Sequence, residues 1–410
     1  MPAGKGRWRS AQPHLLHLMK KALEKVRDNF LVYGSPKIEE NEIEEVIQTL
    51  RSGWIGTGPK VAQFERDFSA YKGNHGHPVA VNSCTAALHV SMIAAGLKPG
   101  DEVITTPMTF CATVNSIVHA GLIPVLADID PKTLNIDPDE IARKITPRTK
   151  AILIVHFAGR ACEMDAIVAL AEKHHLKLIE DCAHAIETTY KGRPAGTFGD
   201  FGCFSFYVTK NIITGEGGMI YAKDEAYAAR CKILALHGMS KDAWKRFSDE
   251  GYKHYQVVEC GFKYNMMDLQ ASIGLQQLKR IDAHWQRRRQ IWEQYNKAFA
   301  SLPIGLPAAT SPDSKHALHL YTIMIDEAKT GISRDSFLSG MTAQNIGVGV
   351  HYQSVPEHPY YQQTFGWKPG DSPFALKAGR QTVSLPLSAK LTDQDVDDVI
   401  LAVRRLVGKN

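Results

Sequence analysis

A chain of 410 residues is long enough to bury a large core and to divide into two lobes. Its formal net charge is +5, and the first 30 residues account for that excess, so a diffuse nucleic-acid-binding surface is not expected. The seven cysteines are scattered and form no CxxC pair, which favours reduced thiols in a cytoplasmic protein over a disulfide framework.

The basic leader, residues 1–33, has apolar side chains at helical spacing from Leu15 to Val26. Its uninterrupted apolar run is very short and no small-residue cleavage site follows, which argues against a signal peptide. We expect an appended segment without catalytic duty. An oligomer-contacting helix, a membrane-surface helix and a disordered arm all stay open. Elsewhere no stretch approaches the roughly 20 apolar residues of a membrane span.

Two amphipathic helices are predicted next, at Glu39–Leu50 and Val61–Tyr71, separated by a glycine-rich break. From Pro78 onward, short apolar runs alternate with helical patterns. The runs fall at 79–81, 103–105, 124–127, 151–156, 177–179, 203–206 and 219–222, and the helices at 86–95, 110–120, 137–144 and 164–175. Such alternation predicts an α/β fold with a mostly parallel sheet that helices cover on both faces.

A long helical stretch from Met267 to Leu302 is predicted to join two lobes. Beyond it the pattern predicts strands at 318–325 and 347–352, and helices at 334–344 and 393–407. We therefore expect three parts: a basic extension at 1–33, a large domain at 34–275, and a linking helix with a small C-terminal α+β domain at 276–410.

Lys210 lies between two apolar runs, directly before a glycine-rich turn. A lysine at such a bend can be partly desolvated, which lowers its pKa and frees the amine to form a Schiff base with an aldehyde. The plainer alternative is a solvated turn lysine beside glycines that the backbone requires.

Asp181 ends another apolar run, at the predicted carboxyl end of a parallel strand, where open sheets bind ligands. A carboxylate there can keep a pyridine nitrogen protonated and so make pyridoxal phosphate an electron sink. A helix N-cap is the alternative use of this aspartate. Ser83, Cys84 and Thr85 begin a predicted helix, whose free N–H groups and dipole attract an anion, although such residues are also ordinary caps.

Several motifs occur in an order that resembles the DegT/StrS-type nucleotide-sugar aminotransferases, which are pyridoxal phosphate enzymes of fold type I. The resemblance runs from about Gly34 to the C-terminus. The motifs are Glu180-Asp181-x-Ala183-His184-Ala185, Gly199-Asp200, Phe204-Ser205-Phe206-x-x-x-Lys210-Asn211 and Gly215-Glu216-Gly217-Gly218. Together they are far more specific than a lone short motif.

This resemblance implies a pyridoxal phosphate site in which Lys210 holds the aldehyde and later moves a proton, while Asp181 pairs with the ring nitrogen. It implies that His184 lies near the cofactor ring and that Ser205 binds the cofactor phosphate together with the 83–85 loop. It also implies that the aromatic side chain of Phe110 covers one face of the cofactor ring. Cys84 replaces the glycine that relatives carry, so we expect slightly altered loop geometry.

The block Gly261-Phe-Lys-Tyr-Asn265 places Lys263 where relatives often have asparagine that reaches the partner's phosphate, which implies a homodimer with shared sites. Further family-like blocks imply contacts with the sugar nucleotide, although each residue could instead pack in the core. These residues are Trp54, Thr57, His319, His351 and Tyr352. Histidine pairs at 75/77 and 174/175 lack further ligands, so no metal site is expected.

The activity that the resemblance implies is transfer of an amino group from glutamate or glutamine to a keto group, most similar to C4 of UDP-linked sugars, in amino-sugar biosynthesis. Two alternatives stay open. Related sugar dehydratases carry histidine in place of the lysine, so Lys210 argues against that reaction. A non-catalytic regulatory protein on the same fold has only the basic leader in its favour.

Overall fold

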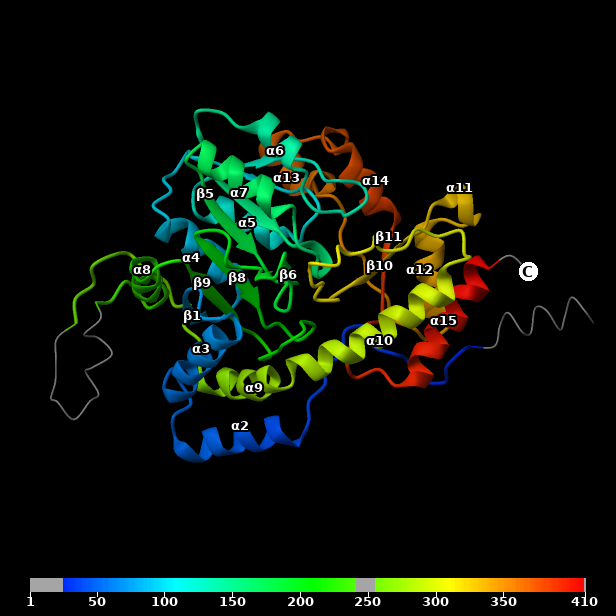
Figure 1. Ribbon diagram of the computed structural model, residues 1–410, viewed down its shortest axis with the longest axis horizontal. Coiled ribbons are helices and arrows are strands. Elements are labelled where there is room, and N and C mark those ends of the chain that lie inside the picture. Colours follow the sequence, from blue (N-terminus) through cyan, green and yellow to red (C-terminus); the bar gives the residue numbers. More distant parts are fainter. Residues whose placement is uncertain (1–24, 241–254, 409–410) are drawn as a thin grey trace, which may run out of the picture.

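The computed structural model describes residues 25–240 and 255–408 (Figure 1). Its centre is a seven-stranded sheet in the order β1-β9-β8-β5-β4-β2-β3. Only β9 runs antiparallel to its neighbours, so the mostly parallel sheet of the prediction is confirmed. The strands are β1 (His77–Val81), β2 (Glu102–Thr105), β3 (Ile123–Leu126), β4 (Thr149–Val155), β5 (Lys177–Asp181), β8 (Phe201–Ser205) and β9 (Gly218–Ala222).

Helices cover both faces of this sheet, and the strands are apolar on both sides for that reason. In β4, Ala151 and Leu153 pack in a core cluster with α4, while Ile152 and Ile154 pack in another with α6 and α7. This alternation follows from the two-residue period of a strand. The helices of this part are α2 (Glu40–Ser52), α3 (Pro59–Tyr71), α4 (Cys84–Ala94), α5 (Cys111–His119), α6 (Pro138–Lys144), α7 (Met164–Lys173), α8 (Glu225–Ala235) and α9 (Asp268–Lys279).

A second core lies between α10 (Ile281–Phe299), α12 (Arg334–Ala343), α15 (Asp393–Val407) and the two-stranded sheet of β10 (Tyr321–Met324) and β11 (Thr382–Leu385). Figure 1 shows α10 leading from the large sheet to this part. The shorter elements are β6 (Thr189–Tyr190), β7 (Arg193–Pro194), α11 (Glu327–Thr330), α13 (Pro359–Phe365), α14 (Pro373–Gln381) and the 3-10 turns η1 (Phe157–Gly159), η3 (Val355–Glu357) and η4 (Pro369–Asp371).

The helical stretch expected from 267 to 302 is confirmed as two helices, which meet where the backbone of Arg280 leaves the helical conformation at φ −109° and ψ 7°. One prediction in this C-terminal part is wrong. The strand expected at 347–352 is absent, since within it only Gly349 makes an isolated bridge, with Ser384. The partner that β10 needs is supplied instead by β11, which the pattern did not predict.

The end of the basic leader packs against the second core. Leu31 bridges Ile346, and Arg27 forms ion pairs of 2.7 and 2.6 Å with Asp395 and Asp398 of α15. The helix expected at 15–26 lies, apart from its last two residues, outside the described part of the chain. Within 25–240 and 255–408, no helix has both the length and the apolar character needed to cross a bilayer.

Candidate active site

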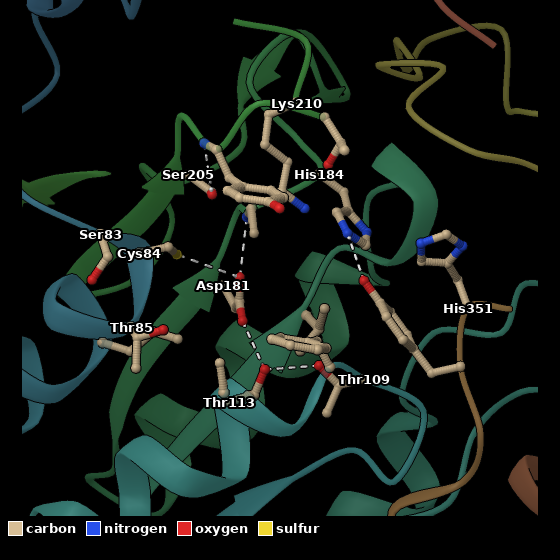
Figure 2. A pocket seen from close by; sticks show the side chains of 18 of the residues that line it. Ser83, Cys84, Thr85, Thr109, Thr113, Asp181, His184, Ser205, Lys210 and His351 are labelled. Atoms are coloured by element: carbon tan, nitrogen blue, oxygen red, sulfur yellow. Dashed lines mark hydrogen bonds between the residues drawn. The ribbon is translucent and has the colours of Figure 1, made fainter. Parts of the chain in front are cut away.

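A cavity of about 560 Å³ opens at the carboxyl ends of β5 and β8. Figure 2 shows that Lys210, Asp181 and His184 all project into it. The start of α4, the start of α5 and the segment 350–352 complete its walls. Open parallel sheets bind ligands at this edge because the strands and helices there leave a crevice with free backbone groups.

Lys210 lies in the connection between β8 and β9, and its amine is largely withdrawn from water. Burial lowers the pKa of Lys210 to about 8, although the nearby Cys84 thiol and Asp181 carboxyl oppose this shift. An amine with this pKa is neutral in a large fraction of molecules near pH 8, and so can act as a nucleophile or a base.

Asp181 ends β5 and is 5% exposed. Its Oδ2 accepts a 2.8 Å hydrogen bond from Thr113 Oγ1, and its Oδ1 accepts one of 3.0 Å from the Ala183 N–H. Burial raises the pKa of Asp181, and these two donors oppose the shift. A carboxylate has about four acceptor positions, so Asp181 can still accept from a cationic N–H in the cavity.

The loop before α4 forms an anion cradle on another wall. Ser83 caps α4 by accepting from the Ala86 N–H at 3.1 Å, and Ser83, Cys84 and Thr85 line the cavity where the helix begins, at the end that carries its unpaired N–H groups. Gly218 presses against this loop, because a Cβ there would lie 2.5 Å from the carbonyl carbon and oxygen of Ser83. Ser205, at the end of β8, lines the same cavity.

Cys84 fits this loop by turning its thiol away from the cradle. Its Sγ lies 3.5 Å from the Cys203 carbonyl oxygen and 4.0 Å from Asp181 Oδ1, a contact drawn in Figure 2. Burial raises the pKa of the Cys84 thiol well above its usual value, so the sulfur stays protonated and donates. Cysteine is larger than the glycine that relatives carry here, and its side chain is accommodated against the carboxyl end of β8.

The remaining walls are aromatic and neutral. Phe110, the N-cap residue of α5, lines the cavity with a side chain that is 58% exposed, which leaves a ring face available for stacking. The Tyr352 ring lies next to Phe110, with the two ring centroids 6.0 Å apart. Tyr352 Oη and His184 Nε2 are 3.0 Å apart, and His351 Nδ1 lies 2.9 Å from Ser384 Oγ. Burial, followed by the charge of Lys210, lowers the pKa of both His184 and His351.

Residues 36–404 match the DegT/DnrJ/EryC1/StrS aminotransferase family. The chain belongs to this family. This aminotransferase is 50% identical to the spore coat polysaccharide biosynthesis protein SpsC of Bacillus subtilis, over 93% of this chain and 98% of that protein. It is also similar to the putative sugar aminotransferase Spr1654 of Streptococcus pneumoniae, whose PMP-form gives a TM-score of 0.86 at 34% identity and covers 92% and 99% of the two chains.

Another similar structure is DesI, described in the presence of its TDP-sugar product. It has a TM-score of 0.82 at 32% identity, with 94% of this chain and 95% of that chain covered. These likenesses and the family match show that the enzyme is a sugar aminotransferase, a transaminase of fold type I, as the motifs around Lys210 had indicated.

Not every residue expected at the site lies in this cavity. Trp54 and Thr57 line a different cavity of about 500 Å³, and Lys263 is exposed on the loop that pairs with Leu236. His319 lies behind the cavity wall, with its ring centroid 4.4 Å from that of His184. A single copy of the aminotransferase therefore brings Lys210 together with Asp181, His184, Ser205, the 83–85 loop, Phe110, His351 and Tyr352.

The sequence did not point to Thr113 or Thr109. Thr113 donates to Asp181, so the hydrogen bond of 2.7 Å between the two hydroxyls must run from Thr109 to Thr113. Their spacing of four residues beside Phe110 is the signal that could have found them, since it places both on one side of a helix start.

One buried group in the described residues has metal-ligating side chains, namely His156, Glu180 and Cys182. Two of its three side chains already have hydrogen-bond partners: His156 Nδ1 accepts from the Cys162 N–H, and His156 Nε2 lies 3.0 Å from Glu180. The Glu180 carboxylate also accepts from three backbone N–H groups, of residues 196, 198 and 199. This cluster is built to hold the loop before β8.

We predict that Gly218→Ala weakens binding of pyridoxal phosphate by about tenfold or more, because the added methyl would displace the loop whose N–H groups face the phosphate. Absorbance titration with the cofactor measures this affinity. Gly370→Ala is the matched control, since nothing lies within 4 Å of a Cβ at that position. Equal affinity in the two variants would show that the 83–85 loop does not hold the phosphate.

Proposed function

We propose that this enzyme transfers the amino group of glutamate or glutamine to the C4 keto group of a nucleotide-linked sugar, with pyridoxal phosphate as cofactor. The observation that carries the proposal is the shared cavity of Lys210 and Asp181, with an anion cradle at one end. The TDP-sugar product of DesI and the polysaccharide pathway in the name of SpsC support a nucleotide-sugar substrate. The C4 position rests on the resemblance of the block at 261–265 to the same block in aminotransferases that act at C4 of UDP-linked sugars.

The residues present fit the cofactor. Asp181 has acceptor capacity for a ring N–H, and the 58% exposed ring of Phe110 offers a face for stacking. The first N–H groups of α4, with Ser83, Thr85 and Ser205, would hold the phosphate. When bound, pyridoxal phosphate supplies an aldehyde carbon and an electron-withdrawing ring.

The side chains of this chain would then do three things. Asp181 keeps a proton on the ring nitrogen, because a buried carboxylate stabilises an adjacent cationic N–H. Lys210 takes and returns a proton at its Nζ, for which a pKa of about 8 is suited at neutral to mildly basic pH. The buried, neutral His184 and the partly buried Tyr352 screen this exchange from bulk water.

A second copy of the chain completes the site in this proposal. Lys263 is exposed and Trp54 is 57% exposed, although both belong to segments expected to contact ligand. A two-fold dimer would place these segments at the partner's cavity, with the Lys263 ammonium at the phosphate. All seven cysteines are free thiols, which supports a cytoplasmic location.

Reduction of the enzyme with borohydride in the presence of pyridoxal phosphate should attach the label to Lys210, at a rate that rises through about pH 8 as the ammonium loses its proton. Peptide mapping locates the label. Lys72 is the internal control: burial lowers its pKa to about 8 as well, but its amine donates to the Ile186 and Ala195 carbonyls away from the cavity. A label absent from Lys210 removes the proposed function.

A panel of UDP-, dTDP- and GDP-linked sugars, each with a ketone at C3 or at C4, tests the substrate assignment. With glutamate as donor, mass spectrometry should find an amino-sugar product from a 4-keto substrate and none from its 3-keto counterpart. Lys210→Ala is the negative control. Amination of 3-keto sugars alone would contradict the proposed position.

Mixing two inactive variants tests the shared site. If Lys263 acts in the partner's cavity, heterodimers of Lys210→Ala with Lys263→Ala contain one intact site, and random reassortment restores about a quarter of the activity. If Lys263 serves its own cavity, the mixture stays as inactive as its components. Turnover after co-refolding or co-expression is the measurement.

A further inference from the structure

Asn211 follows Lys210 in the chain, and its hydrogen-bond partners determine the orientation of its side-chain amide. Its Nδ2 donates to Glu187 Oε2 at 2.7 Å and to the Ala317 carbonyl at 3.0 Å. A reversed amide would place its oxygen against these two acceptors, which is unfavourable. Asn211 Oδ1 must therefore face His319, and it lies 2.9 Å from Nδ1 of that ring.

This contact assigns the hydrogen on His319. An amide oxygen can only accept, so His319 Nδ1 must be the nitrogen that carries hydrogen. Burial, followed by the charge of Lys210, lowers the pKa of His319 well below its usual value, so the ring is neutral. Its Nε2 is consequently a bare acceptor.

His184, whose ring packs against His319, carries its hydrogen on the other nitrogen. The Ala158 N–H donates to His184 Nδ1 at 3.2 Å, so His184 Nε2 holds the hydrogen and donates to Tyr352 Oη. Tyr352 thus receives this bond and retains its own hydroxyl hydrogen for an acceptor in the cavity. Ala158 also accepts from the His319 backbone N–H through its carbonyl, and so holds both residues in place.

The chain of contacts begins at a buried ion pair. Glu187 is 2% exposed and Arg288 of α10 is 3% exposed, and Glu187 Oε1 accepts from Arg288 Nη2. Glu187 therefore uses one oxygen for Arg288 and the other for Asn211. A neutral glutamine in its place would have a single acceptor oxygen for these two donors.

We propose that Glu187 is a positioning residue of the aminotransferase: through Asn211 it fixes the hydrogen on His319 Nδ1, and so sets the arrangement of the His319, His184 and Tyr352 wall beside Lys210. The Ala158 N–H sets the hydrogen on His184, and the His319 ring that packs against His184 keeps the His184–Tyr352 pair in place. The consequence for substrate is that Tyr352 holds its hydroxyl hydrogen toward the cavity. The expected effect on turnover rests on the proposed function, whereas the assignment of the hydrogens to His319 and His184 is independent of it.

The test uses Glu187→Gln in protein labelled with ¹⁵N-histidine, without added cofactor. With Arg288 on the remaining oxygen, the NH₂ group of the substituted side chain would oppose Asn211 Nδ2, so the Asn211 amide turns over and offers a donor to His319. Two-bond ¹H–¹⁵N correlation should show the His319 hydrogen on Nδ1 in the wild type and on Nε2 in the variant. Loss of the signal in His319→Gln assigns it.

Asn211→Leu is the second variant, because it keeps the contact of Glu187 with Arg288 but removes the acceptor for His319, together with the bonds that Asn211 donates to Glu187 and to the Ala317 carbonyl. It should abolish the Nδ1 preference. Glu42→Gln is the matched control: Glu42 is 1% exposed and paired with Arg280, but has no contact with this chain of residues. Thermal unfolding of each variant, measured in parallel, identifies any that fail to fold.

In turnover assays, Glu187→Gln and Asn211→Leu should lower kcat about tenfold, the loss of roughly one hydrogen bond's free energy in the transition state, with Glu42→Gln unchanged. Hydrogen on His319 Nε2 in the wild type, or an unmoved hydrogen in both variants, overturns the proposal. Expected NMR results with no turnover of any keto-sugar by the wild type would instead count against the proposed function.

Discussion

The withdrawal of one amine from water, opposite a buried carboxylate, is the constraint on which the other parts of this site depend. Lys210 and Asp181 line the same cavity, and burial moves both pKa values toward the neutral form. Each group reduces the pKa shift of the other, because opposite charges attract strongly in a poorly solvated space.

Burial of a lysine does not by itself make a reactive group, as Lys72 shows. Its pKa is also lowered to about 8, but its amine donates to two backbone carbonyls and lies 4.5 Å from the centroid of the Phe204 ring. Lys72 is thereby held as a structural tie between α3 and the loop before β8. Lys210 differs because it faces open volume.

The cavity depends on segments that are far apart along the chain. Thr113 orients Asp181 from α5, Gly218 seats the loop before α4, and Tyr352 arrives from the C-terminal part. The ion pair of Glu187 with Arg288 ties α10 to the residue that follows the lysine. The helix that joins the two cores thus also contributes to the order of the site.

The sequence by itself determined the sheet, most of the helices around it, and the pair Lys210 and Asp181. Local signals sufficed for these, because apolar periodicity reflects burial on one or both faces and the motifs around 181 and 210 are contiguous. The last helix, at 393–407, was predicted with its observed bounds for the same reason.

Only the tertiary structure decided how the second part of the chain pairs and which side chains meet. The segment at 347–352 has an apolar pattern but forms no strand: it lies beside β11 and makes a single bridge there, from Gly349 to Ser384. The hydrogen positions on His184 and His319 depend on Ala158 and Asn211, which no spacing rule connects to them. Contacts between residues more than a hundred positions apart are set by packing, and packing leaves no local trace in the sequence.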